Sequence, residues 1–403
     1  MTDYAASAPG FEMARFTPPK RVLLGPGPSP VDQRVIDAMS VPLLGHLDPA
    51  FLKCMDEIQT MLRYVFQTKN RVTFPISGTG SAGMEAAIVN AVETGDDVVV
   101  CAMGAFGERM LEIAERAGAN VVAVRSEWGE PVDRNRIEAA LKACRPRALA
   151  LVHAETSTGV LQDLEGLAEL AHSYGSLLIV DAVASLGGLP VAVDRDNIDI
   201  CYSGSQKCLS APPGLAPITL SDLALERIRT RRSKVQSWYL DISMVEHYWN
   251  AARTYHHTAP ISNNYALHEA LRLVCEEGLE ARWRRHRLNY EALVAGIEAM
   301  DIAFLVPAEQ RPWSVNAVCV PDGIDDVRVR RRLVETAGVD IAGGLGKLKS
   351  KVWRIGLMGS GSTQENVLLL LNGLHAALTA EGYHCSSGVA AAEAVYSGDA
   401  VPA

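Results

Sequence analysis

Two stretches near the middle of the chain decide the fold: residues 177–181, LLIVD, and residues 198–207, IDICYSGSQK. Each begins as a short apolar run, typical of a buried strand, and each ends in polar residues. In a parallel sheet the carboxyl ends of the strands line the ligand crevice. We therefore expect Asp181 and Lys207 to face one crevice. Taken singly, Asp181 could instead cap a turn or helix, and Lys207 could be an ordinary surface-loop lysine.

Short apolar runs and longer amphipathic stretches alternate around these two segments. Strands separated by helices of 10–15 residues indicate βαβ units and a mostly parallel sheet, and near-continuous apolar strands indicate a sheet covered on both faces. The predicted strands are 98–101, 121–124, 148–153, 177–180 and 198–202, and the predicted helices are 106–117, 134–144 and 164–174.

The pattern changes after about residue 260. One long helix is predicted from Asn264 to about Met300, and its basic run at 282–287, RWRRHR, is expected to form a solvated face. Short strands at 317–320 and 352–355 with intervening helices then indicate a smaller α+β domain. The predicted organisation is an N-terminal arm 1–20, a large domain 21–280, a small domain 281–385 and a poorly ordered Ala/Gly/Ser-rich tail 386–403.

Composition narrows the class of protein. The 403 residues are 48% hydrophobic and 21% charged, as in ordinary globular proteins, and 38 basic against 47 acidic side chains argue against a nucleic-acid partner. The eight cysteines form no CxxC pair, so neither a disulfide framework nor a metal site is expected. Without a signal peptide or a membrane-spanning stretch, a cytoplasmic protein is predicted.

A third stretch, residues 74–83, FPISGTGSAG, precedes a predicted helix from Met84 to Val92. Small residues at a helix N-terminus expose N–H groups that bind a phosphate. Gly78 to Gly83 also matches GxGxxG, but the strand at 98–100 runs into Met103 without the acid that binds a ribose. One phosphate therefore fits better than a dinucleotide, and an NAD-dependent dehydrogenase is the alternative from another class.

A phosphate-binding turn, an acid and a lysine together point to pyridoxal phosphate. An acid can keep the pyridine nitrogen protonated, and a lysine can bind the aldehyde. Phe106 is placed to stack on the ring, although a single aromatic is more often part of the core. Arg354, in the strand of the small domain, could bind a substrate carboxylate bidentately or could form a surface ion pair.

Several motifs carry a resemblance to a known family. In chain order they are GPGP 25–28, SGTGS 77–81, HAETSTG 153–159, VDAVAS 180–185, YSGSQK 202–207, YHHT 255–258, GGLG 343–346 and RIG 354–356. Their identity and order resemble the alanine–glyoxylate and serine–glyoxylate (serine–pyruvate) aminotransferases, from about residue 20 to 380. These are class V pyridoxal-phosphate-dependent aminotransferases of fold type I.

The resemblance implies a seven-stranded, mostly parallel sheet in the large domain and a homodimer with shared active sites. It also implies a role for each matching residue. Lys207 would form the internal aldimine and act as general base, Asp181 would bind the pyridine nitrogen, Val183 would pack under the ring and Thr156 would contact its hydroxyl side. The phosphate would be held by Thr79, Gly80, Ser81 and Gln206, with Tyr255 and Thr258 from the other subunit, and the substrate by Arg354, Gly27 and Thr156.

The implied reaction moves the amino group of alanine or serine to glyoxylate or a related 2-oxo acid. Pyridoxamine–pyruvate and aspartate–glyoxylate transamination are the alternatives on the same fold. Two positions depart from the mammalian members, which carry tryptophan in place of Phe106 and histidine in place of Ser81. His46 and Asp48, in the segment LGHLD at 44–48, receive no interpretation from the sequence.

Overall fold

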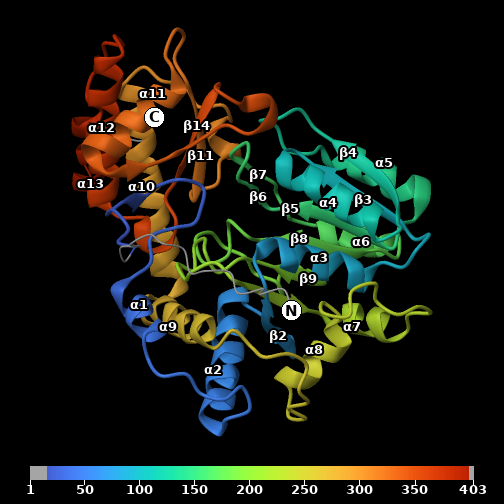
Figure 1. Cartoon of the computed structure of the whole chain (residues 1–403). Coiled ribbons are helices and arrows are strands. Elements are labelled where there is room, and N and C mark those ends of the chain that lie inside the picture. The colour runs from blue at the N-terminus through green and yellow to red at the C-terminus, as the bar shows by residue number, and fades with distance from the viewer. Residues whose placement is uncertain (1–15, 399–403) are drawn as a thin grey trace, which may run out of the picture.

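The computed structural model describes residues 16–398. Most of the predicted N-terminal arm and the last five residues of the predicted tail lie outside that range. A layered α/β part holds the central sheet, and a smaller part built from the C-terminal third packs beside it (Figure 1). The architecture agrees with the α/β class expected from the sequence.

The central sheet has seven strands in the order β2-β10-β9-β8-β5-β3-β4. All neighbours pair in parallel except β10, which is antiparallel to both β2 and β9. The expected mostly parallel, seven-stranded sheet is therefore confirmed. The strands are β2 Val72–Ser77, β3 Asp97–Ala102, β4 Asn120–Arg125, β5 Ala148–Val152, β8 Leu177–Asp181, β9 Ile200–Tyr202 and β10 Leu215–Leu220.

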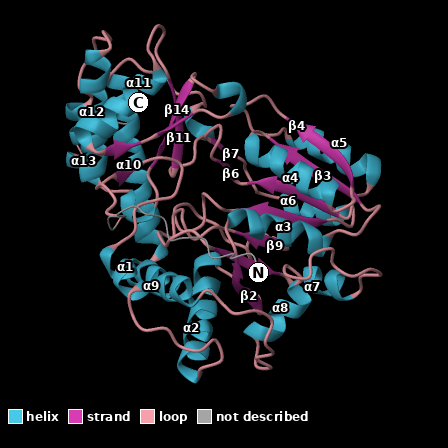
Figure 2. Cartoon of the chain, viewed as in Figure 1, coloured by secondary structure: helices cyan, strands magenta, loops and turns pink. Residues whose placement is uncertain are grey.

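Apolar composition explains why these strands lie at the centre. Every residue of β5 (ALALV) and β8 (LLIVD) is buried, which requires cover on both faces of the sheet. Helices supply that cover (Figure 2). The helices of this part are α1 Gln33–Met39, α2 Pro49–Phe66, α3 Gly80–Ala91, α4 Ala105–Arg116, α5 Arg134–Cys144, α6 Leu167–Ser173, α7 Asp222–Arg229, α8 Ile242–Trp249 and α9 Ile261–Glu277; a short hairpin pairs β6 Ala154–Glu155 with β7 Val160–Leu161.

The smaller part surrounds a three-stranded antiparallel sheet, β11-β14-β13. Its core includes Trp353, which is fully buried. The start of the chain joins this part, because Val22 pairs with Val339 and Leu24 belongs to the same core. The elements are β1 Val22–Leu23, β11 Val315–Cys319, β12 Val339–Asp340, β13 Ala342–Gly343, β14 Val352–Gly356, α10 Leu279–Ala299, α11 Asp326–Arg332, α12 Gln364–Ala380 and α13 Val389–Ser397.

Two expectations about helices are wrong. The single helix predicted from Asn264 to Met300 is two, α9 and α10, separated by Gly278 at φ +78°, a backbone conformation that favours glycine and ends the first helix. The tail, expected to be poorly ordered, contains helix α13. Its apolar residues pack against α10 and α12, and Tyr396 donates a hydrogen bond to Asn289 of α10 at 2.7 Å.

The basic run of α10 is only partly a solvated face. Arg284 and Arg287 are exposed as expected, but the side chain of Arg282 is 5% exposed and His286 is fully buried. These two residues lie four positions apart and so share one face of the helix. That face points into the protein, because α10 bridges the two parts of the chain (Figure 1).

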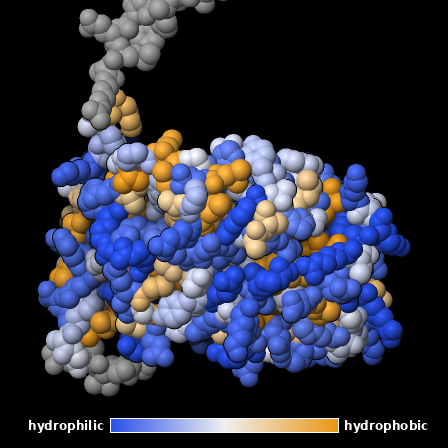
Figure 3. All heavy atoms as spheres, turned by 90° about the horizontal axis from the view of Figure 1, so that it is seen from below, coloured by the Kyte–Doolittle hydropathy of each residue, from blue (hydrophilic) through white to orange (hydrophobic). Residues whose placement is uncertain are grey.

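On the face drawn in Figure 3, hydrophilic side chains cover most of the area and apolar ones lie in small groups. Across residues 16–398, none of the helices combines the length and hydrophobicity that crossing a bilayer requires.

Candidate active site

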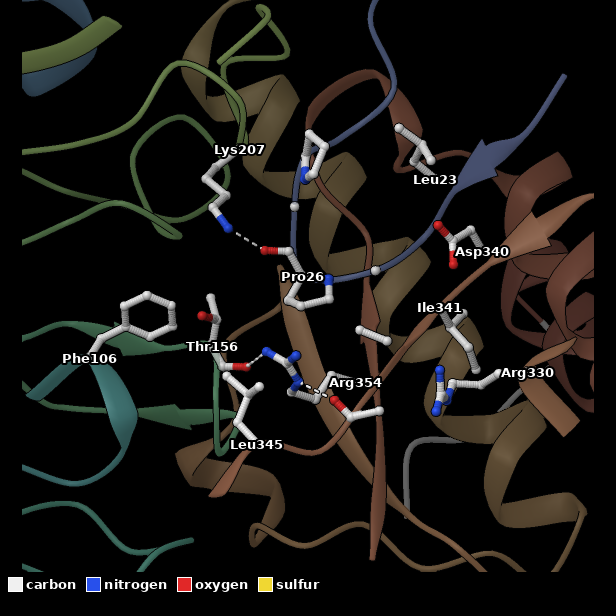
Figure 4. A pocket seen from close by; sticks show the side chains of 15 residues that line it. Leu23, Pro26, Phe106, Thr156, Lys207, Arg330, Asp340, Ile341, Leu345 and Arg354 are labelled. Atoms are coloured by element: carbon white, nitrogen blue, oxygen red, sulfur yellow. Dashed lines mark hydrogen bonds between the residues drawn. The ribbon is translucent and has the colours of Figure 1, made fainter. Parts of the chain in front are cut away.

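Lys207 lies in the loop that follows β9 and is buried. Its ammonium group donates a hydrogen bond to the backbone oxygen of Pro26 (Figure 4). Gly27, at φ +103°, passes so close that a Cβ there would lie 2.5 Å from Nζ of Lys207. A side chain here would displace the end of the Lys207 chain, and the positive φ of this position favours glycine.

Asp181 ends β8 and lines the same cavity of about 230 Å³ as Lys207. Its carboxylate accepts hydrogen bonds from Val183 N at 2.8 Å and from the Tyr202 hydroxyl at 2.9 Å. Burial raises the pKa of Asp181 to about 7, against the two hydrogen bonds that lower it. Burial lowers the pKa of Lys207 to about 8. Both groups therefore exchange protons near neutral pH.

Most of the side chains singled out in the sequence gather around this cavity. They are Thr79, Gly80, Ser81, Phe106, Thr156, Asp181, Val183, Gln206 and Lys207, and Met84, Arg109, Val152, Ala154 and Ala184 complete the lining. Tyr255 and Thr258 do not line it. Tyr255 is 55% exposed, and its hydroxyl lies 3.4 Å from the Thr258 hydroxyl on the surface of the chain.

One end of the cavity suits a phosphate. Helix α3 begins here, and its N-cap Thr79 makes no side-chain capping hydrogen bond. The N–H groups of Ala82 and Gly83 donate to the backbone oxygen of Thr79, so those of Gly80 and Ser81 are the ones left for an anion at this helix N-terminus. Among the described residues, the buried amide oxygen of Gln206 has no hydrogen-bond partner. Because an amide can turn over, its N–H₂ can face an anion instead. The hydroxyl of Ser81 completes this end.

Arg109 adds a positive charge that the sequence analysis missed. Its guanidinium donates a hydrogen bond to the Ser81 hydroxyl at 3.0 Å and lies 4.8 Å from the centre of the Phe106 ring. Arg109 follows Phe106 by three residues on α4, a spacing that places both side chains on one face. That spacing is the one signal in the sequence that could have identified it.

Glu155 is a second residue the sequence analysis did not single out. Its fully buried carboxylate accepts hydrogen bonds from the N–H groups of Phe106 and Gly107, both at 3.1 Å, and from Ser157 N at 3.0 Å. The Ser157 hydroxyl donates a further bond at 2.6 Å. Burial raises the pKa of Glu155, and these four donors oppose that shift. Glu155 thereby caps α4 and fixes Phe106.

A second cavity of about 520 Å³ adjoins the first and shares Phe106, Thr156 and Lys207 with it. Arg354, buried on β14, donates to Gly343 O at 2.8 Å and to Thr156 O at 3.3 Å (Figure 4). Burial lowers the pKa of Arg354, but a guanidinium stays charged. A substrate carboxylate in this cavity would meet Arg354 on one side and Lys207 on the other.

Arg330 brings another guanidinium to the second cavity. It lies on α11, pairs with Asp326 at 2.6 Å, and packs so near Gly343 that a Cβ there would be 3.2 Å from its Nη2. Arg354 and Arg330 thus flank the same glycine. Asp340 lines the cavity near Arg330 (Figure 4).

The structure explains one of the two residues that the sequence left without interpretation. Asp48 is the N-cap of α2, where its carboxylate accepts a hydrogen bond from Ala50 N at 2.8 Å. The ring of His46 lies 5.0 Å from that of Tyr255, on the exposed side of the chain. In the described part of the chain, no group of three or more His, Cys, Asp or Glu side chains is arranged to hold a metal ion.

Known proteins resemble the chain over almost its whole length. The aminotransferase class-V family model matches residues 21–387. The chain is 43% identical to (S)-ureidoglycine–glyoxylate transaminase of Bacillus subtilis (89% of this chain, 91% of that one), and 43% identical to alanine–glyoxylate aminotransferase of Callithrix jacchus (91% and 89%).

A solved structure extends the likeness to the fold. Alanine–glyoxylate aminotransferase from Nostoc sp. superposes with a TM-score of 0.90 at 48% identity, over 91% of this chain and 98% of that one. Both parts of the chain are covered, so the fold is that of the fold-type I aminotransferases. The chain belongs to the class-V aminotransferase family and is a transaminase.

Proposed function

We propose that the protein is a pyridoxal-phosphate-dependent aminotransferase that transfers the amino group of alanine or serine to glyoxylate. One observation carries the proposal: Lys207, Asp181 and Arg354 are all buried around two cavities that share Lys207. A lysine, an acid and a carboxylate anchor are the groups that this cofactor and an amino acid need. The names of the relatives supply glyoxylate as the acceptor.

The cavity fits the cofactor at both ends. Thr79, Gly80, Ser81 and Gln206 would hold the phosphate at the N-terminus of α3, with Arg109 as a nearby positive charge. At the other end, Asp181 would bind the protonated pyridine nitrogen. Pyridoxal phosphate supplies an electron sink for the carbanion at the substrate Cα.

The protein side chains supply proton transfer and orientation. Lys207 would bind the cofactor aldehyde and, once displaced by the amino donor, would take and return the Cα proton. Its pKa of about 8 suits a base near neutral pH, because a catalytic base works best when its pKa lies near the working pH. Arg354 would hold the carboxylate bidentately.

The lining next to Lys207 and Arg354 accommodates small donors. Gly27 packs against Lys207, and Leu345 and Phe106 line the same cavity as Arg354. Alanine and serine have side chains that need little room next to these residues.

A second copy of the chain would complete the site. Leu43, Trp238 and Tyr255 are large apolar or aromatic side chains that are 55–68% exposed, and a second copy could cover them. Tyr255 and Thr258 do not line their own cavity, so we infer that they reach the phosphate of the partner subunit in a homodimer. All eight cysteines are free thiols, which suits the reducing cytoplasm.

The visible absorption spectrum tests the cofactor and substrate together. We expect purified protein loaded with pyridoxal phosphate to show a yellow band that bleaches with alanine or serine and returns with glyoxylate. Lys207→Ala should lose the band, and borohydride treatment of the loaded protein should label Lys207. A protein that binds no pyridoxal phosphate would contradict the proposal and favour the dinucleotide alternative. Bleaching by aspartate alone, or by pyridoxamine alone, would show that this compound is the amino donor in place of alanine or serine.

Mixing two inactive variants tests the shared site. Lys207→Ala removes the lysine that a subunit supplies to its own site. The double variant Tyr255→Phe/Thr258→Ala removes the hydroxyl groups that a subunit would supply to the site of its partner. In a mixed dimer one of the two sites regains every intact residue, so an equal mixture after subunit exchange should recover about a quarter of the wild-type activity. A mixture that stays inactive while forming mixed dimers would show that each subunit is self-sufficient.

A further inference from the structure

Three consecutive backbone oxygens around Lys207 are each held by a distant segment. The oxygen of Gln206 accepts a hydrogen bond from Ser29 N at 2.9 Å, and that of Lys207 accepts one from the Ser29 hydroxyl at 2.7 Å. The third, on Cys208, accepts one from the guanidinium of Arg282 at 2.6 Å. The lysine loop is therefore fixed by the N-terminal segment on one side and by α10 on the other.

Arg282 makes a full set of contacts inside the protein. Besides the Cys208 oxygen, its guanidinium donates to Gly187 O at 3.1 Å and to the Glu277 carboxylate at 2.7 Å. A buried cation is costly unless it is paired and hydrogen-bonded, and Arg282 is both. The guanidinium of Arg282 therefore binds groups inside the protein, the lysine loop among them, and does not face solvent.

The next turn of α10 contacts the segment that follows β14 in the smaller part of the protein. His286 Nε2 accepts a hydrogen bond from Gly359 N at 2.9 Å, while Nδ1 lies 2.8 Å from the oxygen of Arg282. Because Nε2 is an acceptor, the proton of the neutral ring is on Nδ1, which donates to Arg282. Burial and the adjacent arginines lower the pKa of His286 to about 3, so the ring is neutral at neutral pH.

Two further contacts close the link between the small domain and the lysine loop. Arg285 donates to the oxygens of Gly359 and Ser362 at 2.9 and 2.6 Å. The N–H of Ser360 donates to the hydroxyl of Ser210 at 2.8 Å, and Ser210 follows Lys207 by three residues in the lysine loop. The turn Gly359–Gly361 follows β14, the strand that carries Arg354, by only three residues.

We propose that Arg282 and His286 are positioning residues that set the separation between Lys207 and Arg354, and so restrict the enzyme to amines that carry a carboxylate on the reacting carbon. The proposal rests on the proposed function for its substrates. An amino acid presents its nitrogen and carboxylate from a single carbon, so both anchors must be placed together. A misplacement of about 1 Å in such a site can cost about a hundredfold in rate.

The cofactor-free protein allows a test that does not depend on transamination. Glyoxylate and formaldehyde each modify lysine in the presence of cyanoborohydride, but only glyoxylate carries a carboxylate for Arg354. We would measure by mass spectrometry the ratio of glyoxylate to formaldehyde modification at Lys207. The variant Arg354→Met gives the reference value of this ratio for a protein that lacks the arginine that would bind the carboxylate.

Three variants of α10 then separate positioning from stability. Arg282→Met should lower the ratio at Lys207 about tenfold, toward that of Arg354→Met, and Arg282→Lys should restore part of it. Arg284→Met is the matched control, because it also removes an arginine from α10. The side chain of Arg284 is 72% exposed, and its one ion pair, with Glu280, is long at 3.8 Å, so the ratio should not change.

Arg285→Met is a milder second variant if Arg282→Met does not fold. It removes two of the hydrogen bonds to the segment 359–362 and the ion pair of Arg285 with Glu277, but keeps the bonds of Arg282 to the Cys208 and Gly187 oxygens, and the ratio should again fall. An unchanged ratio in folded Arg282→Met or folded Arg285→Met would overturn the proposal, and so would an equal fall in Arg284→Met. Failure of the proposed function would instead appear as a wild-type protein that selects glyoxylate but does not transaminate.

In the loaded enzyme, the same variants should change substrate preference. Arg282→Met should slow bleaching of the cofactor band by alanine about tenfold more than bleaching by ethylamine, which has no carboxylate. A variant that is only less stable would slow both equally, and that result would count against positioning.

Discussion

The carboxylate of Glu155 holds the backbone of Phe106 in place by accepting the hydrogen bond of its N–H group at 3.1 Å. One oxygen accepts the N–H groups of Phe106 and Gly107, and the other accepts the backbone N–H and hydroxyl of Ser157. A side chain in one strand hairpin therefore fixes the start of α4, and with it the aromatic ring expected to stack on the cofactor.

Glu155→Gln should weaken cofactor binding without removing any group that touches the cofactor. The amide places an N–H₂ against N–H donors, and a buried donor without a partner costs about 1–3 kcal/mol. Titration of the cofactor-free protein with pyridoxal phosphate should show a Kd raised about tenfold or more. Glu108→Gln, which alters a surface ion pair on the same helix, should bind normally. Equal Kd values for the two variants would show that Phe106 needs no such support.

Gly27→Ala should prevent Lys207 from reaching the cofactor. The added methyl would overlap Nζ and the end of the lysine chain, and the positive φ of Gly27 disfavours any other residue. Borohydride labelling of Lys207 should fall below a tenth of the wild-type level. Gly25→Ala, where the methyl meets only ordinary contacts of 3.6 Å or more, should label fully. Full labelling of Gly27→Ala would show that the lysine takes another path.

The cofactor-free protein should lose stability as pH rises from about 4 to 7 because of Asp181. In this window the unfolded chain has released the proton of that carboxyl, while the folded protein, with a pKa of about 7, still holds it. Folding therefore takes up a proton, and the unfolding free energy falls with rising pH. The full difference of about 3 pKa units corresponds to about 4 kcal/mol.

Urea unfolding at pH 5 and pH 7 measures that effect. Because Asp181→Asn cannot titrate, its stability relative to wild type should increase between the two pH values. A difference that stays constant, or one of the opposite sign, would show that Asp181 is ionised in the cofactor-free protein throughout.

Arg330→Ala should impair donors with a second carboxylate more than alanine. The guanidinium lies beside Gly343, whose oxygen accepts a hydrogen bond from Arg354, and would attract a second carboxylate in the same cavity. We expect KM for aspartate to rise about tenfold and KM for alanine to change less than about threefold. Arg331→Ala removes a neighbouring exposed arginine and should change neither. If both donors respond equally to Arg330→Ala, the arginine acts on the fold and not on the substrate.

Local patterns in the sequence were sufficient for the parallel sheet and for the residues at its edge. Asp181 ends β8 and Lys207 lies in the loop after the neighbouring strand β9, so one rule about parallel sheets brings them together. The break between α9 and α10 was not predicted, because a glycine within a helical pattern is often tolerated. Only the structure shows that Gly278 has a positive φ and ends α9.

Contacts between distant residues were beyond those patterns. Arg282 belongs to a basic run, which is usually exposed, and only the carbonyls of Gly187 and Cys208 together with Glu277 make its burial stable. Glu155 likewise depends on the start of α4, about fifty residues earlier in the chain. The contacts of Arg282 and of Glu155 join residues far apart in the chain, and no periodic pattern in a single sequence indicates them.

The pairing of Val22 with Val339 has a consequence for how the protein is made. The segment that places Gly27 beside Lys207 leaves the ribosome more than three hundred residues before its partner strand. Arg354 is made later still. A nascent chain can therefore expose the reactive lysine long before it has a carboxylate anchor. Selection of the substrate can therefore begin only after both the lysine loop and the strand of Arg354 have been synthesised.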